Sequence, residues 1–217
     1  MDDQTAYKAN YRCHEPGISP EEVASSYTDW APKYDETLCP GRYNGPDIAA
    51  EEVALRIPKE QRERVTIIDV AAGTGRVGLL LKQKGFTNID ALEPSKGMMD
   101  LLKETGVYGK TYQEFLGARQ NSVPDDTYDV LVIAGGMGEG HIPVKGVDDM
   151  IRMTKSGGLV IIVMRKEYLE DVVEYKNRLI PHIDTLEKEG KWSKVEVKVV
   201  PSYSFNKDGL VFTYKVT

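Results

Sequence analysis

The stretch VTIIDVAAGTGRVGLL, residues 65–80, decides the fold of this protein. Its first half is a short apolar run typical of a buried β-strand, and its second half has helical spacing. Between the two halves, Gly73, Gly75 and Gly78 follow the pattern G-x-G-x-x-G. Glycines at such a turn let the backbone approach a ligand closely, and the first N–H groups of the following helix point at it. The stretch alone predicts a loop for an adenosyl ligand, either NAD or another compound with a ribose and an adenine.

The same alternation of strand and helix continues along the chain. Apolar, β-branched runs predict strands at residues 64–70, 88–93, 128–134 and 158–164, with a weaker candidate at 108–113. Helical patterns that end at a glycine lie between them, at residues 75–85, 95–106 and 143–158. Strands that alternate with helices of this length imply right-handed crossovers and a doubly wound, mostly parallel sheet.

The last third of the chain departs from this rhythm. Residues 165–192 have the pattern of one long amphipathic helix, which Pro181 kinks or divides. The apolar face of this helix is predicted to contain Leu169, Val172, Val173, Leu179, Ile183 and Leu186. Alternating runs on either side of NKDG predict an antiparallel hairpin, with strands at residues 194–205 and 210–216. We therefore expect an α/β fold with a Rossmann-like, mostly parallel seven-stranded sheet that ends in an antiparallel hairpin.

The N-terminal part has a different composition from the rest. Residues 1–45 are rich in aromatic and turn residues, and we expect them to form a helical cap or lid on the sheet. Residues 46–217 then form the α/β domain, and the cap and this domain make a single structural unit.

Composition argues against several classes of function. The 217 residues carry a net charge of −6 and no block of consecutive basic residues, so no nucleic-acid partner is expected. No apolar run approaches the roughly 20 residues that span a bilayer, and the polar N-terminus does not look like a targeting segment, so no membrane partner is expected. With only Cys13 and Cys39 and no metal-ligand spacing, we expect a reduced, cytoplasmic protein without a metal. Oligomeric state is not readable from the sequence.

Two carboxylates help to choose the ligand of the glycine loop. Glu93 closes the second predicted strand, 20 positions after Gly73, where a carboxylate can accept both hydroxyls of a ribose. Asp69 stands directly before the loop, where it would repel a pyrophosphate and attract an ammonium group. Charge chemistry therefore favours S-adenosylmethionine over NAD.

Four motifs follow one another in a recognisable order: IIDVAAGTGRVG, LEPSKGMM, YDVLVIAGG and KSGGLVIIV. Together they resemble the motif set of class I S-adenosylmethionine-dependent methyltransferases, over about residues 20–165. YTDWAPKYDETL, YNGPDIAAEEV and LEKEGKW also resemble the methyltransferase-like protein family of the Williams–Beuren region. Ala71 stands where the broader class most often has a glycine, and we expect a negative φ there.

The resemblance implies cofactor contacts for the residues that match the motifs. Those expected at the methionine part are Asp69, Ala71, Ala72, Gly73, Gly75 and Arg76, while Glu93 takes the ribose. Those expected around the adenine are Pro94, Met98, Gln113 and Glu114, and Ala134 borders the methyl group that is transferred. The alternative for Met98 is simple core packing.

Tyr27, Trp30 and Tyr34 lie at helical spacing in SSYTDWAPKYD and share one face of a helix that Pro32 is expected to interrupt. This face either packs on the body of the domain or forms a lid. As a lid, Tyr27 or Tyr34 would offer a hydroxyl to the cofactor or the substrate, and aromatic faces would attract a sulfonium. The candidates for contact with the substrate in this segment are Trp30, Arg42 and Tyr43.

The loop AGGMGEGHIP, residues 134–143, follows the fourth main strand. Gly135 and Met137 are expected beside the substrate. His141 is the candidate general base, with Glu139 and Tyr27 as further catalytic candidates. Alternatively, His141 only caps the loop. A neutral amine or a carboxylate would need no base, because the in-line approach to a sulfonium methyl supplies much of the acceleration.

The sequence thus predicts an enzyme that transfers a methyl group from S-adenosylmethionine to an oxygen or nitrogen atom of a small molecule. A protein methyltransferase and a non-catalytic protein that binds S-adenosylmethionine remain as alternatives.

Overall fold

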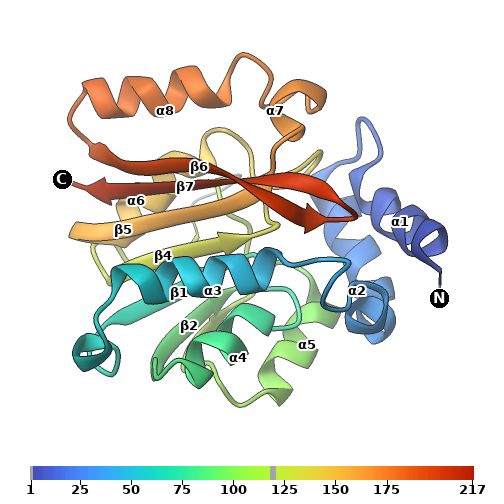
Figure 1. Ribbon diagram of the computed structural model, residues 1–217, viewed down its shortest axis with the longest axis horizontal. Helices are drawn as coiled ribbons and strands as arrows, with labels where there is room; N and C mark the ends of the chain where they lie inside the picture. The colour runs from blue at the N-terminus through green and yellow to red at the C-terminus, as the bar shows by residue number, and fades with distance from the viewer. Residues whose placement is uncertain (1, 118–120) are drawn as a thin grey trace.

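The computed structural model describes residues 2–117 and 121–217. Its centre is a seven-stranded sheet with the order β3-β2-β1-β4-β5-β7-β6, seen edge to edge in Figure 1. The strands are β1 Thr66–Val70, β2 Asn88–Leu92, β3 Thr111–Tyr112, β4 Tyr128–Ala134, β5 Thr154–Arg165, β6 Trp192–Ser204 and β7 Lys207–Val216. The first five strands are parallel, whereas β7 runs antiparallel to both β5 and β6. The predicted fold class, with its final hairpin, is confirmed.

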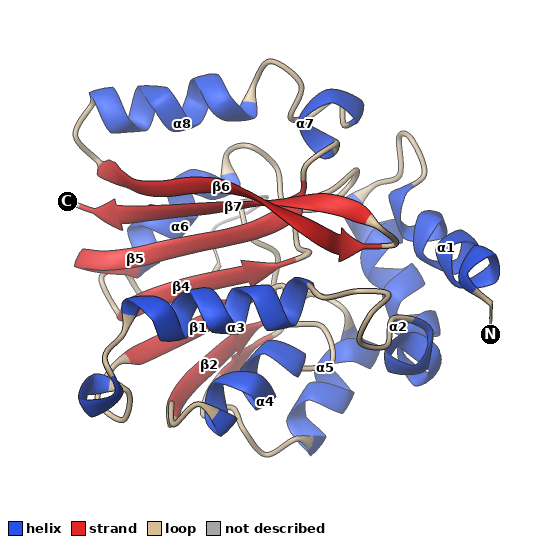
Figure 2. Cartoon of the chain, viewed as in Figure 1, coloured by secondary structure: helices blue, strands red, loops and turns tan. Residues whose placement is uncertain are grey.

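Helices cover both faces of the sheet (Figure 2). Those of the N-terminal part are α1 Asp3–Tyr11, the 3₁₀ turn Arg12–His14 and α2 Pro20–Thr37. Those on one face are α3 Gly45–Arg56, α4 Arg76–Gln83 and α5 Lys96–Glu104, with a 3₁₀ turn at Lys59–Gln61 before β1. Those on the other face are α6 Gly146–Met153, the short α7 Tyr168–Asp171 and α8 Leu179–Lys188. No helix in the described ranges is long and apolar enough to cross a membrane.

Both faces of the central strands are apolar, as their continuous hydrophobic runs require. Side chains alternate along a strand, so Ile67 packs with α3 and α4 while its neighbour Ile68 packs on the side of α6 and α8. Both isoleucines are fully buried. This burial on two faces fixes the register, because a shift by one residue would exchange the two sets.

The position of the binding cleft follows from the strand order. From β1 the chain first moves outward through β2 and β3, and then returns to form β4 and β5 on the other side of β1. The crossovers that leave β1 and β4 run in opposite directions along the sheet. The gap between them lies at the carboxyl ends of β1 and β4, where an open α/β sheet binds its ligands. In Figure 1, α1 and α2 lie beyond this end of the sheet.

The predicted long helix at residues 165–192 is wrong. The chain forms α7 and α8 separately, and Asn177 between them has a left-handed backbone with φ 57°. Pro181 lies in the first turn of α8, where its missing N–H breaks no helical hydrogen bond. Val173, predicted on the apolar face, is 76% exposed in the connection between the helices.

Pro32 does not interrupt α2, which is continuous from Pro20 to Thr37. A proline inside a helix removes one hydrogen bond, here the one to the carbonyl of Thr28. Packing offsets this loss, since the backbone of Thr28 lies directly against Gly97 in α5. A capping box at Ser19 and Glu22 further stabilises the start of the helix.

The hairpin and the N-terminal part are joined. The hairpin turns tightly at Phe205 and Asn206, both with positive φ, rather than over NKDG. Beside this turn, Asn44 N–H donates to the carbonyl of Tyr203 (2.8 Å), and Phe205 N–H donates to that of Arg42 (2.8 Å). Nearer the hairpin's other end, the buried carboxylate of Glu52 in α3 accepts hydrogen bonds from Lys198 and Thr213.

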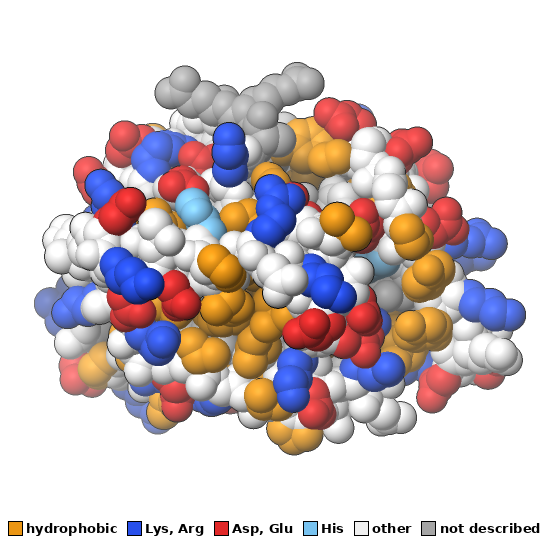
Figure 3. All heavy atoms as spheres, turned by 90° about the horizontal axis from the view of Figure 1, so that it is seen from above, with side chains coloured by type: hydrophobic (Ala, Val, Ile, Leu, Met, Phe, Trp, Pro, Cys, Tyr) orange, Lys and Arg blue, Asp and Glu red, His pale blue; other side chains and the backbone are white. Residues whose placement is uncertain are grey.

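Figure 3 shows the face that carries α8 and β6. Basic and acidic side chains are mixed there, with hydrophobic side chains between them. Exposed valines on the outermost strand contribute to the apolar part, namely Val195, Val197 and Val199. On this face, therefore, basic side chains do not form one continuous block.

Candidate active site

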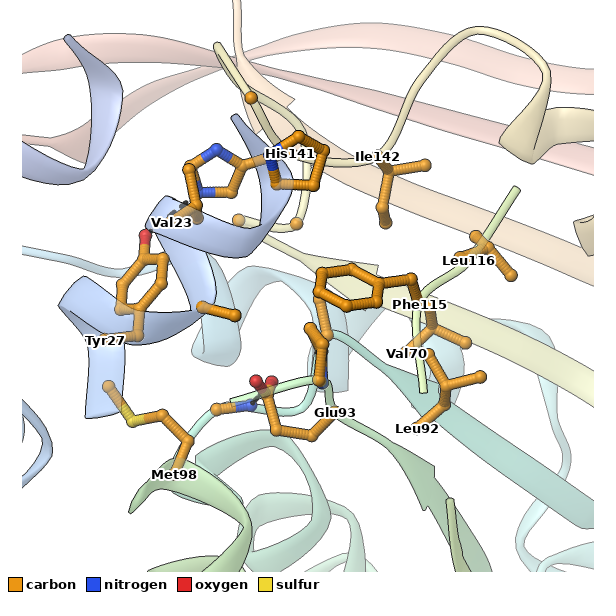
Figure 4. Close-up of a pocket in the computed structure, with 18 of the residues that line it drawn as sticks. Val23, Tyr27, Val70, Leu92, Glu93, Met98, Phe115, Leu116, His141 and Ile142 are labelled. Atoms are coloured by element: carbon orange, nitrogen blue, oxygen red, sulfur yellow. Dashed lines mark hydrogen bonds between the residues drawn. The ribbon is translucent and has the colours of Figure 1, made fainter. Parts of the chain in front are cut away.

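A cavity of about 370 Å³ opens at the carboxyl ends of β1, β2 and β4, where the strand order predicts a ligand site. We call it the main cavity (Figure 4). Among its lining residues are eight predicted cofactor contacts: Tyr27, Tyr34, Ala71, Gly73, Glu93, Pro94, Met98 and Ala134. The lining is mostly apolar, with Glu93, His141 and the tyrosines as the polar groups.

The glycine loop borders the cavity, and three of its residues have left-handed backbone conformations. Ala71, Gly73 and Gly75 have φ values of 53°, 57° and 90°. The negative φ expected at Ala71 is therefore wrong, and this alanine occupies a conformation that costs an L-residue about 1–2 kcal/mol. A side chain at Gly73 would meet no protein atom within 4 Å, so the loop leaves open space on that side. Such a gap suits a ligand that approaches the backbone closely.

Glu93 is held with both carboxylate oxygens in fixed positions. One oxygen accepts a hydrogen bond from Gly73 N–H (2.8 Å), and the other accepts one from Ser95 N–H (2.8 Å). The residue is 5% exposed, and burial raises the pKa of its carboxyl to about 7. Each oxygen keeps a further lone pair, and Figure 4 shows the carboxylate directed into the cavity. This is the geometry required to accept two adjacent hydroxyl groups.

Asp69 is placed differently from the prediction and does not line the main cavity. Its carboxylate lies beneath the loop and accepts a hydrogen bond from the hydroxyl of Tyr108 (2.6 Å). The same hydroxyl accepts one from Gly78 N–H (3.1 Å), so Asp69 supports the start of α4 through Tyr108. Burial raises the pKa of Asp69 to about 7. Its other oxygen, Oδ1, is buried and has no hydrogen-bond partner among the described residues, so the predicted contact with a ligand ammonium stays a prediction.

The adenine side of the site also needs a correction. Gln113 is exposed, and the carboxylate of Glu114 accepts a hydrogen bond from Ser122 N–H (2.9 Å); neither lines the cavity. The next residues along the chain, Phe115, Leu116 and Gly117, line it instead. In Figure 4, Phe115 and Leu116 face Met98 and Glu93 across the cavity. The weak strand candidate at 108–113 contains the two residues of β3, but it did not indicate that the residues after Glu114 form the wall of the cavity.

Helix α2 forms the roof of the main cavity through Pro20, Val23, Ala24, Tyr27 and Tyr34. Two contacts fix it there. The hydroxyl of Thr28 lies 2.9 Å from that of Ser95, the N-cap of α5. The hydroxyl of Thr74 in the glycine loop donates to the carboxylate of Asp35 (2.8 Å).

Tyr27 and His141 meet at the roof. The Nδ1 of His141 lies 2.7 Å from the carbonyl oxygen of Glu139, which requires a proton on that nitrogen. Its Nε2 therefore accepts the hydrogen bond from the hydroxyl of Tyr27, at 3.0 Å. Removal of water from the ring lowers the pKa of His141 to about 4, so the ring is neutral at pH 7.

Several other predicted site residues lie outside the main cavity. Glu139 accepts a hydrogen bond from Gly17 N–H (3.1 Å), and the ring of Trp30 stacks on that of Tyr27 and meets that of Tyr34 edge to face. Arg42 pairs with Asp3 at 2.7 Å. These three side chains hold the N-terminal part together, and their predicted contacts with a substrate or in catalysis stay predictions.

The remaining loop residues also have structural positions. Ala72 is buried against Ala91 and α5, and Gly75 starts α4 close to the ring of Tyr108. Arg76 donates to the carbonyls of Leu38 (2.6 Å) and Tyr43 (3.3 Å), which fixes the segment before α3. None of the three lines the main cavity.

A second, smaller recess of about 30 Å³ adjoins the main cavity and shares Tyr27, Tyr34 and Gly135 with it. Of the predicted substrate contacts, Tyr43, Gly135 and Met137 line this recess. Sequence reasoning missed its other polar residues: Asn10, His14, Arg165, Tyr168, Tyr203 and Ser204. They come from α1, the 3₁₀ turn Arg12–His14, β5, α7 and β6, so no local motif could have revealed them. Within the described ranges, no group of three or more His, Cys, Asp or Glu side chains could hold a metal ion.

Comparison with known proteins agrees with the geometry. The family model described as "Methyltransferase domain" matches residues 68–162. Methyltransferase-like protein 27 of Homo sapiens is 30% identical over 166 residues, which cover 76% of this chain and 66% of that protein. A demethylmenaquinone methyltransferase of Renibacterium salmoninarum is 28% identical over 66% of this chain and 58% of its own length. The chain thus spans somewhat less than two thirds of these curated relatives.

A solved structure gives the same fold. The SAM-dependent methyltransferase from Leishmania major superposes with a TM-score of 0.65 at 18% identity, over 95% of this chain and 89% of that one. At this identity the likeness concerns the fold alone.

Proposed function

Because this chain belongs to the class I S-adenosylmethionine-dependent methyltransferases, we propose that it transfers a methyl group to an oxygen or nitrogen atom of a small molecule. S-Adenosylmethionine is the cofactor. The lining of the main cavity suits this cofactor. A buried carboxylate with fixed oxygens faces the cavity, and the loop at Gly73 leaves open space. We assign the ribose hydroxyls to Glu93 and the adenine to the wall of Met98, Phe115 and Leu116.

The roof formed by α2 is the observation that supports a small acceptor. Sites for small molecules have volumes of about 300–1,000 Å³, and the main cavity lies near the lower limit at about 370 Å³. With the cofactor bound, only the region around Gly135 and the adjoining recess remains for the acceptor. A protein substrate would need an open groove, whereas Val23, Tyr27 and Tyr34 close this side of the cavity.

When bound, the cofactor supplies a methyl group on a positively charged sulfur, a strong electrophile. The chain's own residues orient the reactants and exclude water through the roof. The hydroxyl oxygen of Tyr27 can accept a hydrogen bond from the acceptor while its proton is donated to Nε2 of His141. With a pKa of about 4, His141 is a weak base at pH 7. This arrangement favours acceptors that arrive with a free lone pair, such as a neutral amine or a carboxylate.

A ring carbon of a quinone precursor is a second candidate acceptor. Several relatives are named demethylmenaquinone methyltransferases, and another is named a ubiquinone/menaquinone biosynthesis C-methyltransferase. The apolar lining of Val70, Leu92 and Ile142 is compatible with a flat hydrophobic ring. We place the reaction in the cytoplasm, which the two free cysteines support.

The test uses S-adenosylmethionine with a radiolabelled methyl group and three pools of acceptors. These are a metabolite extract, a protein extract and a demethylated quinone precursor, each with heat-denatured protein as the control. Label in small metabolites, in compounds whose new methyl is attached to oxygen or nitrogen, is the expected result. Label in proteins only would overturn the proposal in favour of a protein methyltransferase, and label on the quinone only would favour carbon methylation. If S-adenosylhomocysteine binds but no pool is labelled, the protein binds the cofactor without catalysis.

A further inference from the structure

Arg165, the last residue of β5, lies at the edge of the small recess and is only 5% exposed. The recess is continuous in its lining with the reactive end of the main cavity, because Tyr27, Tyr34 and Gly135 border both. A group in the recess would therefore lie next to the place where the methyl group is transferred.

The guanidinium of Arg165 is incompletely paired. One Nη nitrogen donates to the hydroxyl of Ser204 (2.6 Å), and the other lies 3.3 Å from the carboxylate of Glu167. That carboxylate is shared, because Lys207 also pairs with it at 3.1 Å. The Nε–H of Arg165 is buried and has no hydrogen-bond partner among the described residues.

A buried cation of this kind is costly without an anion. Removal of a charged group from water costs several kcal/mol unless a counter-charge and hydrogen bonds compensate. The rings of Tyr7 and Tyr168 lie 5.9 Å and 5.3 Å from the guanidinium and offset part of this cost. They provide no acceptor for Nε–H, however. The unsatisfied donor therefore points to a ligand group that is negatively charged and accepts hydrogen bonds.

The rest of the recess suits a small acid. The phenols of Tyr43 and Tyr203 line it as uncharged hydroxyls, because burial raises the pKa of both above the ordinary value. Burial lowers the pKa of His14 to about 3, so its ring is neutral. Among the described residues, no carboxylate lines the recess, and its volume of about 30 Å³ has room for one small planar group. A guanidinium matches the geometry of a carboxylate with two parallel hydrogen bonds.

We propose that the small recess binds the carboxylate of the methyl acceptor through Arg165, so that the acceptors of this protein are small carboxylic acids. This inference rests on the proposed function and specifies its substrate class. The methionine carboxylate of the cofactor is the other possible source of the same chemical group. A third interpretation is purely structural, with Arg165 only joining β5 to Ser204 of the hairpin.

The experiment measures binding to the full chain saturated with S-adenosylhomocysteine, by ligand-observed NMR titration. The probes are acetate, propionate and benzoate, each compared with its primary amide, which has the same shape without the charge. The protein is expected to bind at least one acid about tenfold more tightly than its amide, as a charge-assisted pair contributes roughly this factor. Equal affinity for acid and amide in all three pairs, or no binding of any acid, overturns the proposal.

The variants Arg165→Met and Arg165→Lys separate the interpretations. Arg165→Met should abolish the acid preference and leave the affinity for S-adenosylhomocysteine within about twofold. Arg165→Lys, which keeps the charge but lacks the planar fork, should retain a reduced preference, and it remains informative if Arg165→Met does not fold. Arg56→Met is the matched control, because it removes an arginine paired with a buried carboxylate on α3, away from both cavities.

Each failure is distinguishable. An acid preference that persists in Arg165→Met assigns Arg165 to a structural role. A loss of more than tenfold in S-adenosylhomocysteine affinity in that variant assigns it to the cofactor, and either result overturns the proposal. Failure of the wild-type protein to bind S-adenosylhomocysteine would instead contradict the proposed function, and that titration is done first, without acids.

Discussion

Glu93 links the chemistry of the site to pH. In the protein without ligand its carboxyl has a pKa of about 7, raised by burial, so it keeps a proton to a higher pH than an ordinary glutamate. Ribose hydroxyls donate hydrogen bonds best to the ionised carboxylate. At low pH, binding of the cofactor therefore requires Glu93 to lose this proton. Only above pH 7 is the carboxylate already ionised before the cofactor binds.

We expect the affinity for S-adenosylhomocysteine to rise with pH through about 7 and to level off above it, as measured by calorimetry between pH 5.5 and 8.5. Below pH 7 the loss approaches tenfold per pH unit, the limit for one linked proton. Glu93→Gln should weaken binding by about 10- to 100-fold at pH 8 and abolish this pH dependence.

Asp69→Asn provides the control, since Asp69 also has a pKa of about 7 but does not touch the cavity. This variant should keep the pH dependence. If the dependence follows Asp69 rather than Glu93, the assignment of the ribose is wrong.

Residue positions were predictable from sequence only where one local motif determines them. Gly73 and Glu93 were placed correctly on the cavity because the loop and the strand end fix them. Gln113 and Glu114 lie two residues before Phe115 and Leu116, which line the cavity, because the weak strand pattern at 108–113 does not show which of the following residues turn toward the site. Arg165 was missed, since its role depends on a recess assembled from distant segments.

At the scale of elements, the packing of α2 against α5 holds α2 in place over the main cavity. A methyl group added at Gly97 would lie 2.6 Å from the carbonyl oxygen of Thr28 and 2.9 Å from its Cα. These are backbone atoms of a helix, so they cannot move aside individually. The backbone at Gly97 is ordinary for a helix, and an alanine there would act by its volume alone.

Gly97→Ala should therefore lift α2 from α5. We expect weaker binding of S-adenosylhomocysteine by about tenfold or more and faster cleavage of α2 by trypsin, with the far-UV circular dichroism of the sheet unchanged. Lys103→Ala, at an exposed position of the same helix, is the control and should leave both measurements unaltered. Wild-type affinity in Gly97→Ala would show that the roof does not depend on this contact.

Elements with a strong periodic pattern of hydrophobic residues were predicted well. Breaks and turns that depend on the backbone conformation of one or two residues were not. The strands that became β1, β2 and β4 agree with their predicted positions to within two residues. The break between α7 and α8 depends on the left-handed backbone of Asn177, and the hairpin turn on Phe205 and Asn206. Propensity rules do not favour a left-handed phenylalanine, so sequence patterns placed the turn two residues late.

At the scale of the whole molecule, the cofactor joins parts that are far apart in sequence. Its proposed contacts come from α2, the glycine loop, Glu93, the wall after β3 and the loop after β4. A ligand that binds only the folded state at 100 times its dissociation constant stabilises that state by about 2.7 kcal/mol. For a chain of this length, each kcal/mol raises the melting temperature by about 2–4 °C.

S-Adenosylhomocysteine at that ratio should therefore raise the melting temperature by roughly 5–10 °C in a thermal denaturation experiment. NAD at the same concentration should cause no shift, because no lysine or arginine among the described residues lines the cavity to pair with a pyrophosphate. A shift with NAD alone would contradict the cofactor assignment.

The roof over the main cavity also affects the rates at which ligands enter and leave. If the cofactor lies beneath α2, neither its entry nor the departure of its demethylated form can occur until that helix separates from Ser95 and Thr74. Movements of packed elements take microseconds to milliseconds, and such openings often limit enzyme turnover. The first methyl transfer after mixing would then be faster than every later one. The helix that excludes water from the reaction would then also determine how long the product of the reaction stays bound.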